Sequence, residues 1–273
     1  MKPDSFISLH NIKLRYRQIG KGKDILFIHG CPGSIEDWDP VSDILAQKYR
    51  VTLYDRPGHG YSGINGNQCN LRTNARIAST LMVALNLKNA VVVGHSYGAS
   101  TALVMAMQNP KNIKSCVLVA PPGYAPVDVD RISHVLAIPF VGKGITPLLA
   151  PLLGPSMIRK GLGRAFYPKA YLMPEGFINF RLKLWTQTKV AVTRAKELIN
   201  LEEDLNAISR DYNKIEKKVF IVQGEDDTIT HAAVKLNKDI PNSKLYLFKH
   251  TGHYLQYLKT KELLSVIEEA TTI

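Results

Sequence analysis

Short runs of consecutive apolar residues alternate with stretches whose apolar residues recur every three or four positions, from residue 24 to residue 120 and again after residue 217. The runs predict buried strands and the spaced stretches predict amphipathic helices, because side chains repeat every second residue in a strand and every 3.6 residues in a helix. The expected strands cover residues 24–29, 50–54, 90–94, 115–120, 218–222 and 244–248, after an antiparallel hairpin at 6–9 and 12–19; the expected helices cover 37–49, 71–87 and 99–109, with two more near residue 232 and from about residue 254. This alternation predicts an α/β fold with a mostly parallel, doubly wound sheet.

The alternation stops at Pro121-Pro122-Gly123 and resumes only at Lys218. The intervening residues are first rich in proline, glycine and basic side chains, and then show a helical pattern over residues 177–205. Apolar residues are too frequent in this segment for disorder. We therefore predict an α/β core made of residues 1–122 and 215–273, with a helical cap inserted at residues 123–214.

The net charge of +12 is concentrated in the predicted cap. Residues 131–196 hold eleven lysines and arginines and a single acid, Glu175, and so carry +10 of it. This charge is either a solvated surface or a region that attracts an anionic acyl substrate or an anionic interface. Nucleic acid is not an expected partner, because no nucleic-acid motif accompanies the charge. The oligomeric state stays open.

The sequence predicts no membrane-spanning segment. The longest apolar stretch, residues 132–153, is interrupted by Pro139, Lys143, Pro147 and Pro151 before it reaches about 18 apolar residues. We expect at most a weak contact with a membrane surface. The three cysteines lie far apart and suggest no disulfide framework, and the first residues lack the apolar stretch of a secretory signal peptide. Both observations favour the cytoplasm.

The segment Gly94-His95-Ser96-Tyr97-Gly98 follows a predicted buried strand and opens a predicted helix. This is the context of a nucleophile elbow, in which two glycines allow a tight turn that exposes a serine hydroxyl. Chance also produces such a pentapeptide, but its position directly after a strand makes chance a poor explanation. Ser96 is therefore the predicted nucleophile.

A serine hydroxyl needs a base, and that base needs an acid that orients it. His253 follows the last predicted strand and precedes the last helix, whereas the nearby His250 lies closer to the strand and fits a structural role better. The acid is expected between the serine and the histidine in the chain, where a strand is followed by Gly224-Glu225-Asp226-Asp227. We favour Asp227, with Asp226 as the alternative.

The oxyanion of an acyl intermediate requires two backbone N–H donors. Tyr97 follows the nucleophile, and Cys31 lies in the loop after the first core strand, before Pro32, which has no N–H. We predict these two amides as the donors, with no role for the Cys31 thiol. The sequence implies neither a cofactor nor a metal ion.

Taken together, HGCPGS at 29–34, DRPGHGYS at 55–62, GHSYG at 94–98, GEDD at 224–227 and GHYLQ at 252–256 resemble the α/β-hydrolase superfamily. Within it, the chain is similar to the capped branch of haloalkane dehalogenases, epoxide hydrolases, carbon–carbon bond hydrolases and cofactor-free haloperoxidases. The resemblance implies that the residue at position 227 is the acid. Dehalogenases and epoxide hydrolases carry Asp at the elbow to attack saturated carbon, so Ser96 favours acyl chemistry.

The expected activity is hydrolysis of a carboxylic ester or related acyl compound through an acyl-enzyme. Two alternatives stay open: cleavage of a carbon–carbon bond beside a ketone, and a small-ligand receptor with slow turnover. In the cap, Phe180, Arg181 and Trp185 are candidate pocket residues, although an apolar stripe at helical spacing is more often the core of the cap.

Overall fold

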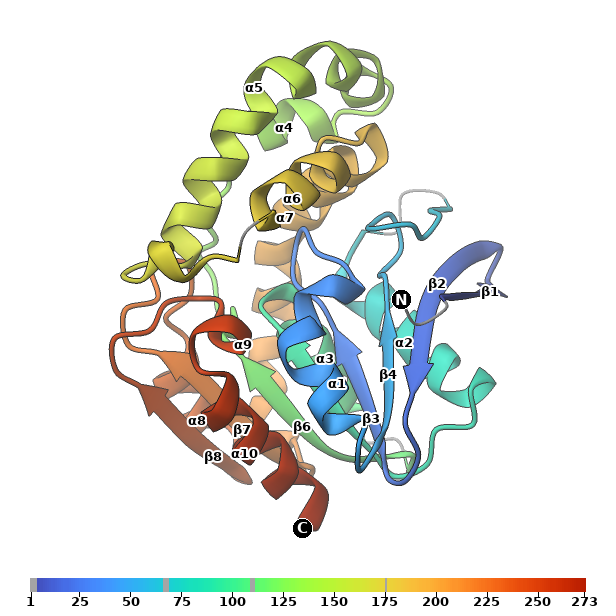
Figure 1. Ribbon diagram of the computed structural model, residues 1–273, viewed down its shortest axis with the longest axis vertical. Helices are drawn as coiled ribbons and strands as arrows, with labels where there is room; N and C mark the ends of the chain where they lie inside the picture. Colours follow the sequence, from blue (N-terminus) through green and yellow to red (C-terminus); the bar gives the residue numbers. More distant parts are fainter. Residues whose placement is uncertain (1–3, 66–68, 109–110, 175) are drawn as a thin grey trace.

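A single mixed sheet forms the centre of the protein (Figure 1). The computed structural model describes residues 4–65, 69–108, 111–174 and 176–273. Its eight strands lie in the order β1-β2-β4-β3-β5-β6-β7-β8; their bounds are β1 Ser5–Leu9, β2 Ile12–Ile19, β3 Asp24–Ile28, β4 Arg50–Tyr54, β5 Ala90–His95, β6 Ile113–Val119, β7 Lys218–Gly224 and β8 Ser243–Phe248. Only β1 with β2 and β2 with β4 pair antiparallel, so the predicted hairpin and mostly parallel sheet are confirmed.

Helices cover both faces of the sheet (Figure 1). Helices α1 (Asp39–Leu45) and α10 (Thr260–Thr272) pack on one face, and α2 (Leu71–Ala84), α3 (Tyr97–Met107) and α8 (Ala233–Asp239) pack on the other. Successive residues of β5 alternate between the two cores, since Val92 contacts the α3 side and Val91 and Val93 the α1 side. A strand covered on both faces reads as a continuous apolar run, which explains the sequence pattern.

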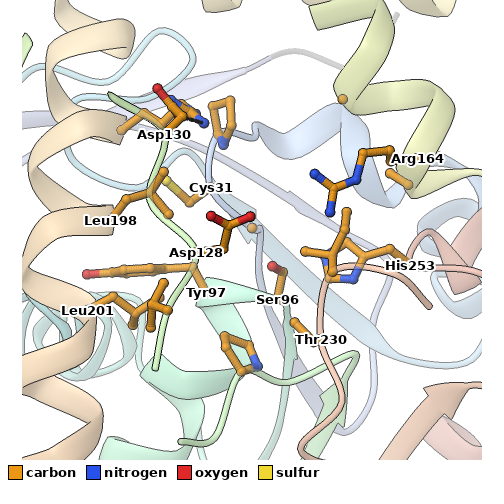
Figure 2. Close-up of a pocket in the computed structure, with 18 of the residues that line it drawn as sticks. Cys31, Ser96, Tyr97, Asp128, Asp130, Arg164, Leu198, Leu201, Thr230 and His253 are labelled. Atoms are coloured by element: carbon orange, nitrogen blue, oxygen red, sulfur yellow. Dashed lines mark hydrogen bonds and ion pairs between the residues drawn. The ribbon is translucent and has the colours of Figure 1, made fainter. Parts of the chain in front are cut away.

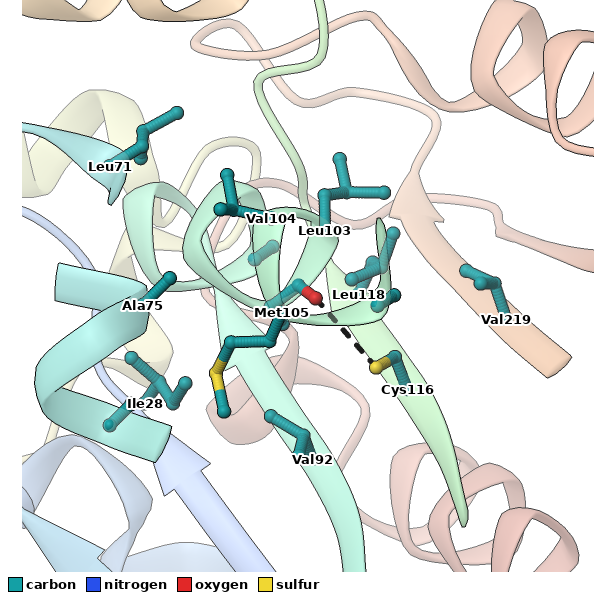
Figure 3. Close-up of a cluster of buried hydrophobic side chains, with 14 of the residues drawn as sticks. Ile28, Leu71, Ala75, Val92, Leu103, Val104, Met105, Cys116, Leu118 and Val219 are labelled. Atoms are coloured by element: carbon teal, nitrogen blue, oxygen red, sulfur yellow. Dashed lines mark hydrogen bonds between the residues drawn. The ribbon is translucent and has the colours of Figure 1, made fainter. Parts of the chain in front are cut away.

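Figure 3 shows the core beneath α3. Leu103, Val104 and Met105 of this helix pack among Val92 of β5 and Leu118 of β6 in one buried cluster. The cluster fixes the start of α3 against the ends of β5 and β6, and that start is where the candidate nucleophile lies. The predicted end of α3 at residues 109–110 lies outside the described residues.

Two predicted helices differ in detail from the observed ones. The segment expected to form one helix at 37–49 is a 3-10 turn, Ile35–Trp38, followed by α1. The pattern at 177–205 is divided into α6 (Phe177–Trp185) and α7 (Thr188–Ile208), because the chain is extended at Gln187.

Helices α4 (Arg131–Ala137), α5 (Val141–Ala165), α6 and α7 lie between β6 and β7 in the chain and form a separate layer above the sheet (Figure 1). We call this segment the β6–β7 insertion. The helix α5 is 25 residues long although it contains Pro147, Pro151 and Pro155. A proline has no N–H, so each one leaves the carbonyl four residues before it without a helical partner. Because the prolines are four residues apart, these carbonyls lie on one side of the helix. Pro147 and Pro151 are exposed, so water can bind the carbonyls there. No helix among the described residues combines the length and the hydropathy that a bilayer crossing requires.

Candidate active site

Ser96 occupies a sharp turn between β5 and α3. Its φ of 53° and ψ of −123° lie outside the regions that residues with a side chain ordinarily adopt. The turn is tight because a Cβ at Gly94 would lie 2.2 Å from the carbonyl oxygen of Gly98, and a Cβ at Gly98 would lie 2.2 Å from that of Ile28. Both glycines are therefore required for this backbone path, and the path directs the Ser96 side chain away from the sheet (Figure 2).

The structure brings His253 and Asp227 into contact. The His253 Nδ1 atom lies 2.8 Å from Asp227 Oδ2, and both side chains are buried. The same carboxylate accepts bonds from the Thr230 hydroxyl at 2.9 Å and the Ile229 amide at 2.8 Å. Burial alone would raise the pKa of Asp227, but the neighbouring His253 and these hydrogen bonds outweigh it and hold the pKa well below its usual range. The carboxylate therefore stays ionised beside the imidazole.

The alternative acid, Asp226, lies elsewhere. Its Oδ2 atom accepts a bond from the Thr251 amide at 3.2 Å, and no contact with His253 is found in the described part of the chain. Asp226 thus stabilises the loop that carries His253 without touching the imidazole. This placement separates two neighbouring acids that look equivalent in the sequence.

A second histidine, His95, lies directly beneath the site. Its Nε2 atom lies 3.0 Å from the backbone oxygen of His253, and the two rings are 4.7 Å apart. Burial and the neighbouring His253 lower the pKa of His95 to about 3, so this ring is neutral near pH 7. His95 therefore supports the histidine loop as a neutral hydrogen-bonding group.

A cavity of about 850 Å³ lies between the sheet and the β6–β7 insertion, and both Ser96 and His253 line it (Figure 2). The core contributes the serine, the histidine and the loops around them. The α5 wall contributes apolar side chains, among them Leu149, Leu153 and Met157. The cavity therefore presents a polar floor and an apolar upper wall.

Cys31 and Tyr97 lie beside Ser96 at the floor of this cavity (Figure 2). Tyr97 is the first residue of α3, so its N–H has no partner within the helix. Cys31 follows β3 and precedes a cis bond to Pro32. The two predicted oxyanion donors thus come from neighbouring strand ends on the same side of the serine.

Arg56 holds both of these segments. Its guanidinium donates to the carbonyl oxygens of His29 at 3.1 Å and Gly30 at 2.9 Å, directly before Cys31, and stacks 4.5 Å from the centre of the Tyr97 ring. The side chain is completely buried. Sequence reasoning missed Arg56, although its motif DRPGHGYS was singled out.

Glu197 of α7 pairs with Arg56, and both side chains are buried. Its two carboxylate oxygens lie 2.5 and 3.0 Å from Arg56 nitrogens, and Oε2 lies 2.9 Å from His59 Nε2. Burial would raise the pKa of Glu197, but the charge of Arg56 and the bonds from Arg56 and His59 outweigh it and lower the pKa. Sequence reasoning missed Glu197 as well. The available signal was its position on the buried stripe of α7, between Thr193 and Leu201.

The ligand atoms of Cys31, His59 and Glu197 lie within 4.8 Å of one another, which is close enough for a metal ion. The donor set fits a metal poorly, because the Arg56 guanidinium occupies both oxygens of Glu197. Burial, followed by the negative charge of Glu197, raises the pKa of the Cys31 thiol, so this group is not a ready thiolate ligand. Glu197 is instead engaged in the ion pair with Arg56.

The three candidate pocket residues of the insertion have different positions. Trp185 lines the cavity, whereas Phe180 and Arg181 are absent from the part of its lining that the structure describes. Arg181 instead pairs with the buried Asp37 of the core and packs 4.1 Å from the Phe177 ring. The expectation that Phe180 and Arg181 form the pocket is corrected, because the ion pair with Asp37 holds this guanidinium in the contact between insertion and core.

Comparison with known proteins identifies the fold. Residues 24–134 match the family model described as "alpha/beta hydrolase fold". Cfl2 from Burkholderia cenocepacia superposes with a TM-score of 0.84 at 17% identity, over 97% of this chain and 94% of that one. The chain has the α/β-hydrolase fold. The resemblance drawn from the five motifs is thereby confirmed.

Two proteins with sequences similar to this chain have descriptive names. The first is the "dihydrolipoyllysine-residue acetyltransferase component of acetoin cleaving system" of Cupriavidus necator, 25% identical over 97% of this chain and 68% of the relative. The second is "2-hydroxy-6-oxononadienedioate/2-hydroxy-6-oxononatrienedioate hydrolase 2" of Pseudomonas putida, 26% identical over 90% of this chain and 87% of the relative.

Proposed function

We propose that this α/β hydrolase is a serine hydrolase that cleaves a carboxylic ester or related acyl compound through an acyl-enzyme, with Ser96, His253 and Asp227 as the triad. The observation that carries the proposal is that Ser96 and His253 line one cavity while Asp227 is bound to the far nitrogen of the imidazole. In this scheme Asp227 fixes the imidazole tautomer, and His253 takes the Ser96 proton as the oxygen attacks a carbonyl carbon.

The later steps use the backbone amides of Cys31 and Tyr97 as donors to the oxyanion. His253 then gives its proton to the leaving group. In the second half of the reaction, His253 takes a proton from water as the water attacks the acyl-enzyme, and returns it to the Ser96 oxygen as the acid product leaves. Residues 123–214 serve as the cap that closes the cavity, with Trp185 in its wall. No cofactor takes part in this scheme. The three cysteines are free in the structure, which supports the proposed cytoplasmic location.

The decisive experiment compares Ser96→Ala with Ser156→Ala, which changes an exposed serine of the insertion. Ser96→Ala should lower kcat for an activated ester by several powers of ten without unfolding the protein, and only this variant should lose labelling by a fluorophosphonate probe. Labelling that persists in Ser96→Ala would refute the assignment of the nucleophile.

A second candidate is hydrolysis of a carbon–carbon bond beside a ketone. It is supported by the relative from Pseudomonas putida, whose substrate name describes a keto compound with two carboxylates. An anionic substrate of this kind would be attracted by Arg164 and Lys235 of the cavity lining, which outnumber Asp128, since the other lining acid, Asp130, is paired with Arg194. Measurement of kcat/KM for a short-chain ester and for an oxo-dienedioate on the same preparation separates the two reactions. A small-ligand receptor would show acylation by the ester without sustained turnover.

A further inference from the structure

One side of α5 exposes large apolar side chains to solvent. Leu148 and Leu152 keep 72% and 75% of their surface exposed, and Phe140, directly before the helix, keeps 88%. Val141 lies seven residues before Leu148, so helical periodicity places it on the same side as both leucines. The helix forms the outer edge of the insertion layer (Figure 1), and the side chains on this side of it stay exposed.

The opposite side of α5 has an evident role. Leu149, Leu153 and Met157 point the other way around the helix and line the cavity above Ser96. The helix is therefore apolar on two sides, of which only the inner one is explained by the cavity. Contiguous exposed apolar side chains on a protein surface mark a contact with another apolar phase or partner.

The charges around the outer side have one sign. Lys143, Arg159 and Lys160 of α5 are exposed, and Arg159 lies seven residues after Leu152 on the same side. Residues 131–174 contain six lysines and arginines and no aspartate or glutamate. Apolar side chains flanked by cations match the boundary between the headgroups and acyl chains of an anionic bilayer.

We propose that this outer face, made of Phe140, Val141, Leu148 and Leu152 with Arg159, docks the protein on an anionic lipid surface with α5 lying in the plane of the interface. At 1.5 Å per residue, residues 141–159 of α5 offer a contact roughly 27 Å long. A second copy of the chain fits this face less well, because a twofold contact would bring the same cations against one another.

The test is co-flotation of the purified full-length protein with vesicles of phosphatidylcholine alone and of phosphatidylcholine mixed with phosphatidylglycerol. Binding should be strong only to the mixed vesicles. Leu148→Ser with Leu152→Ser should lower the partition coefficient at least about tenfold, because two exposed side chains lose their apolar insertion. Arg159→Glu, on the same side of α5 as both leucines, should lower it about fivefold or more, since each cation near an anionic surface contributes a factor of this size.

The matched control is Val83→Ser with Val234→Ser, which removes two equally exposed apolar side chains from α2 and α8 on the core. It should leave partition unchanged. Neither Leu148 nor Leu152 lines the cavity, so unchanged turnover of a short soluble ester would show that the leucine variant is folded. The partition coefficient comes from flotation alone and does not depend on turnover. Equal binding to both kinds of vesicle, equal loss in the control, or concentration-dependent dimerisation abolished by the leucine variant would each overturn the proposal.

Discussion

Removal of the Glu197 carboxylate should destabilise the fold strongly. Both Glu197 and its partner Arg56 are fully buried, and the carboxylate also contacts His59 and accepts a bond from Asn74 at 3.2 Å. Breaking a buried ion pair from one side leaves the other charge without compensation and costs about 3–5 kcal/mol. We therefore expect Glu197→Ala to lower the free energy of unfolding by about that amount, through the Arg56 guanidinium that it leaves unpaired.

Urea unfolding followed by circular dichroism measures this difference. Glu203→Ala, on an exposed position of the same helix, is the matched control and should change the free energy of unfolding by no more than about 0.5 kcal/mol. A loss below about 1 kcal/mol for Glu197→Ala would show that Arg56 is compensated in another way, and would refute the reasoning.

The pH dependence provides a second check. Since the pKa of Glu197 is lowered on folding, its stabilisation is complete above the pKa of an unfolded glutamate, about 4.3, and is lost as pH falls through the lowered value. The gap in stability between wild type and Glu197→Gln should therefore be constant near neutral pH and shrink below about pH 4. A gap that widens on acidification would contradict the assigned sign.

The same network gives Glu197 a positioning role for the proposed reaction. Arg56 bonds the carbonyls that precede Cys31 and stacks on Tyr97, so loosening it should displace the oxyanion donors. In Glu197→Ala, kcat should fall more than KM rises, because the oxyanion forms only as the carbonyl reacts. A change confined to KM would exclude this role.

Three further predictions follow from other parts of the structure. Asp227→Asn should lower kcat by about four powers of ten, and Asp226→Asn far less, because only the former contacts His253; equal losses on one ester would contradict the assignment. Gly98→Ala should reduce the free energy of unfolding by about 1–3 kcal/mol, because its Cβ meets the Ile28 carbonyl, and thermal or urea unfolding measures this. Raising ionic strength from about 0.01 M to about 0.15 M shortens the Debye length from roughly 30 Å to roughly 8 Å, so kcat/KM for an anionic ester should fall while that for a neutral ester of equal length stays constant.

The order of strands and helices and the tight turn at Ser96 could be read from the sequence because local patterns specify them. A continuous run of β-branched residues such as Val91-Val92-Val93 is typical of a strand buried on both faces, as β5 is. The spacing Gly94-x-Ser96-x-Gly98 specifies a tight turn, because the backbone itself leaves no room for a Cβ at either glycine. Residues close in the chain determined these features.

Only the tertiary structure decided which distant side chains meet. Arg56 and Glu197 are 141 residues apart in the chain, and Arg181 and Asp37 are 144 apart, so no local pattern relates them. The sequence identified Arg181 as a candidate for the pocket, but a buried guanidinium requires a buried acid, and the route of the chain placed Asp37 beside it. For the same reason, the sequence showed that the β6–β7 insertion is basic, but only the packing of α5 showed which of its apolar residues face the cavity and which face solvent.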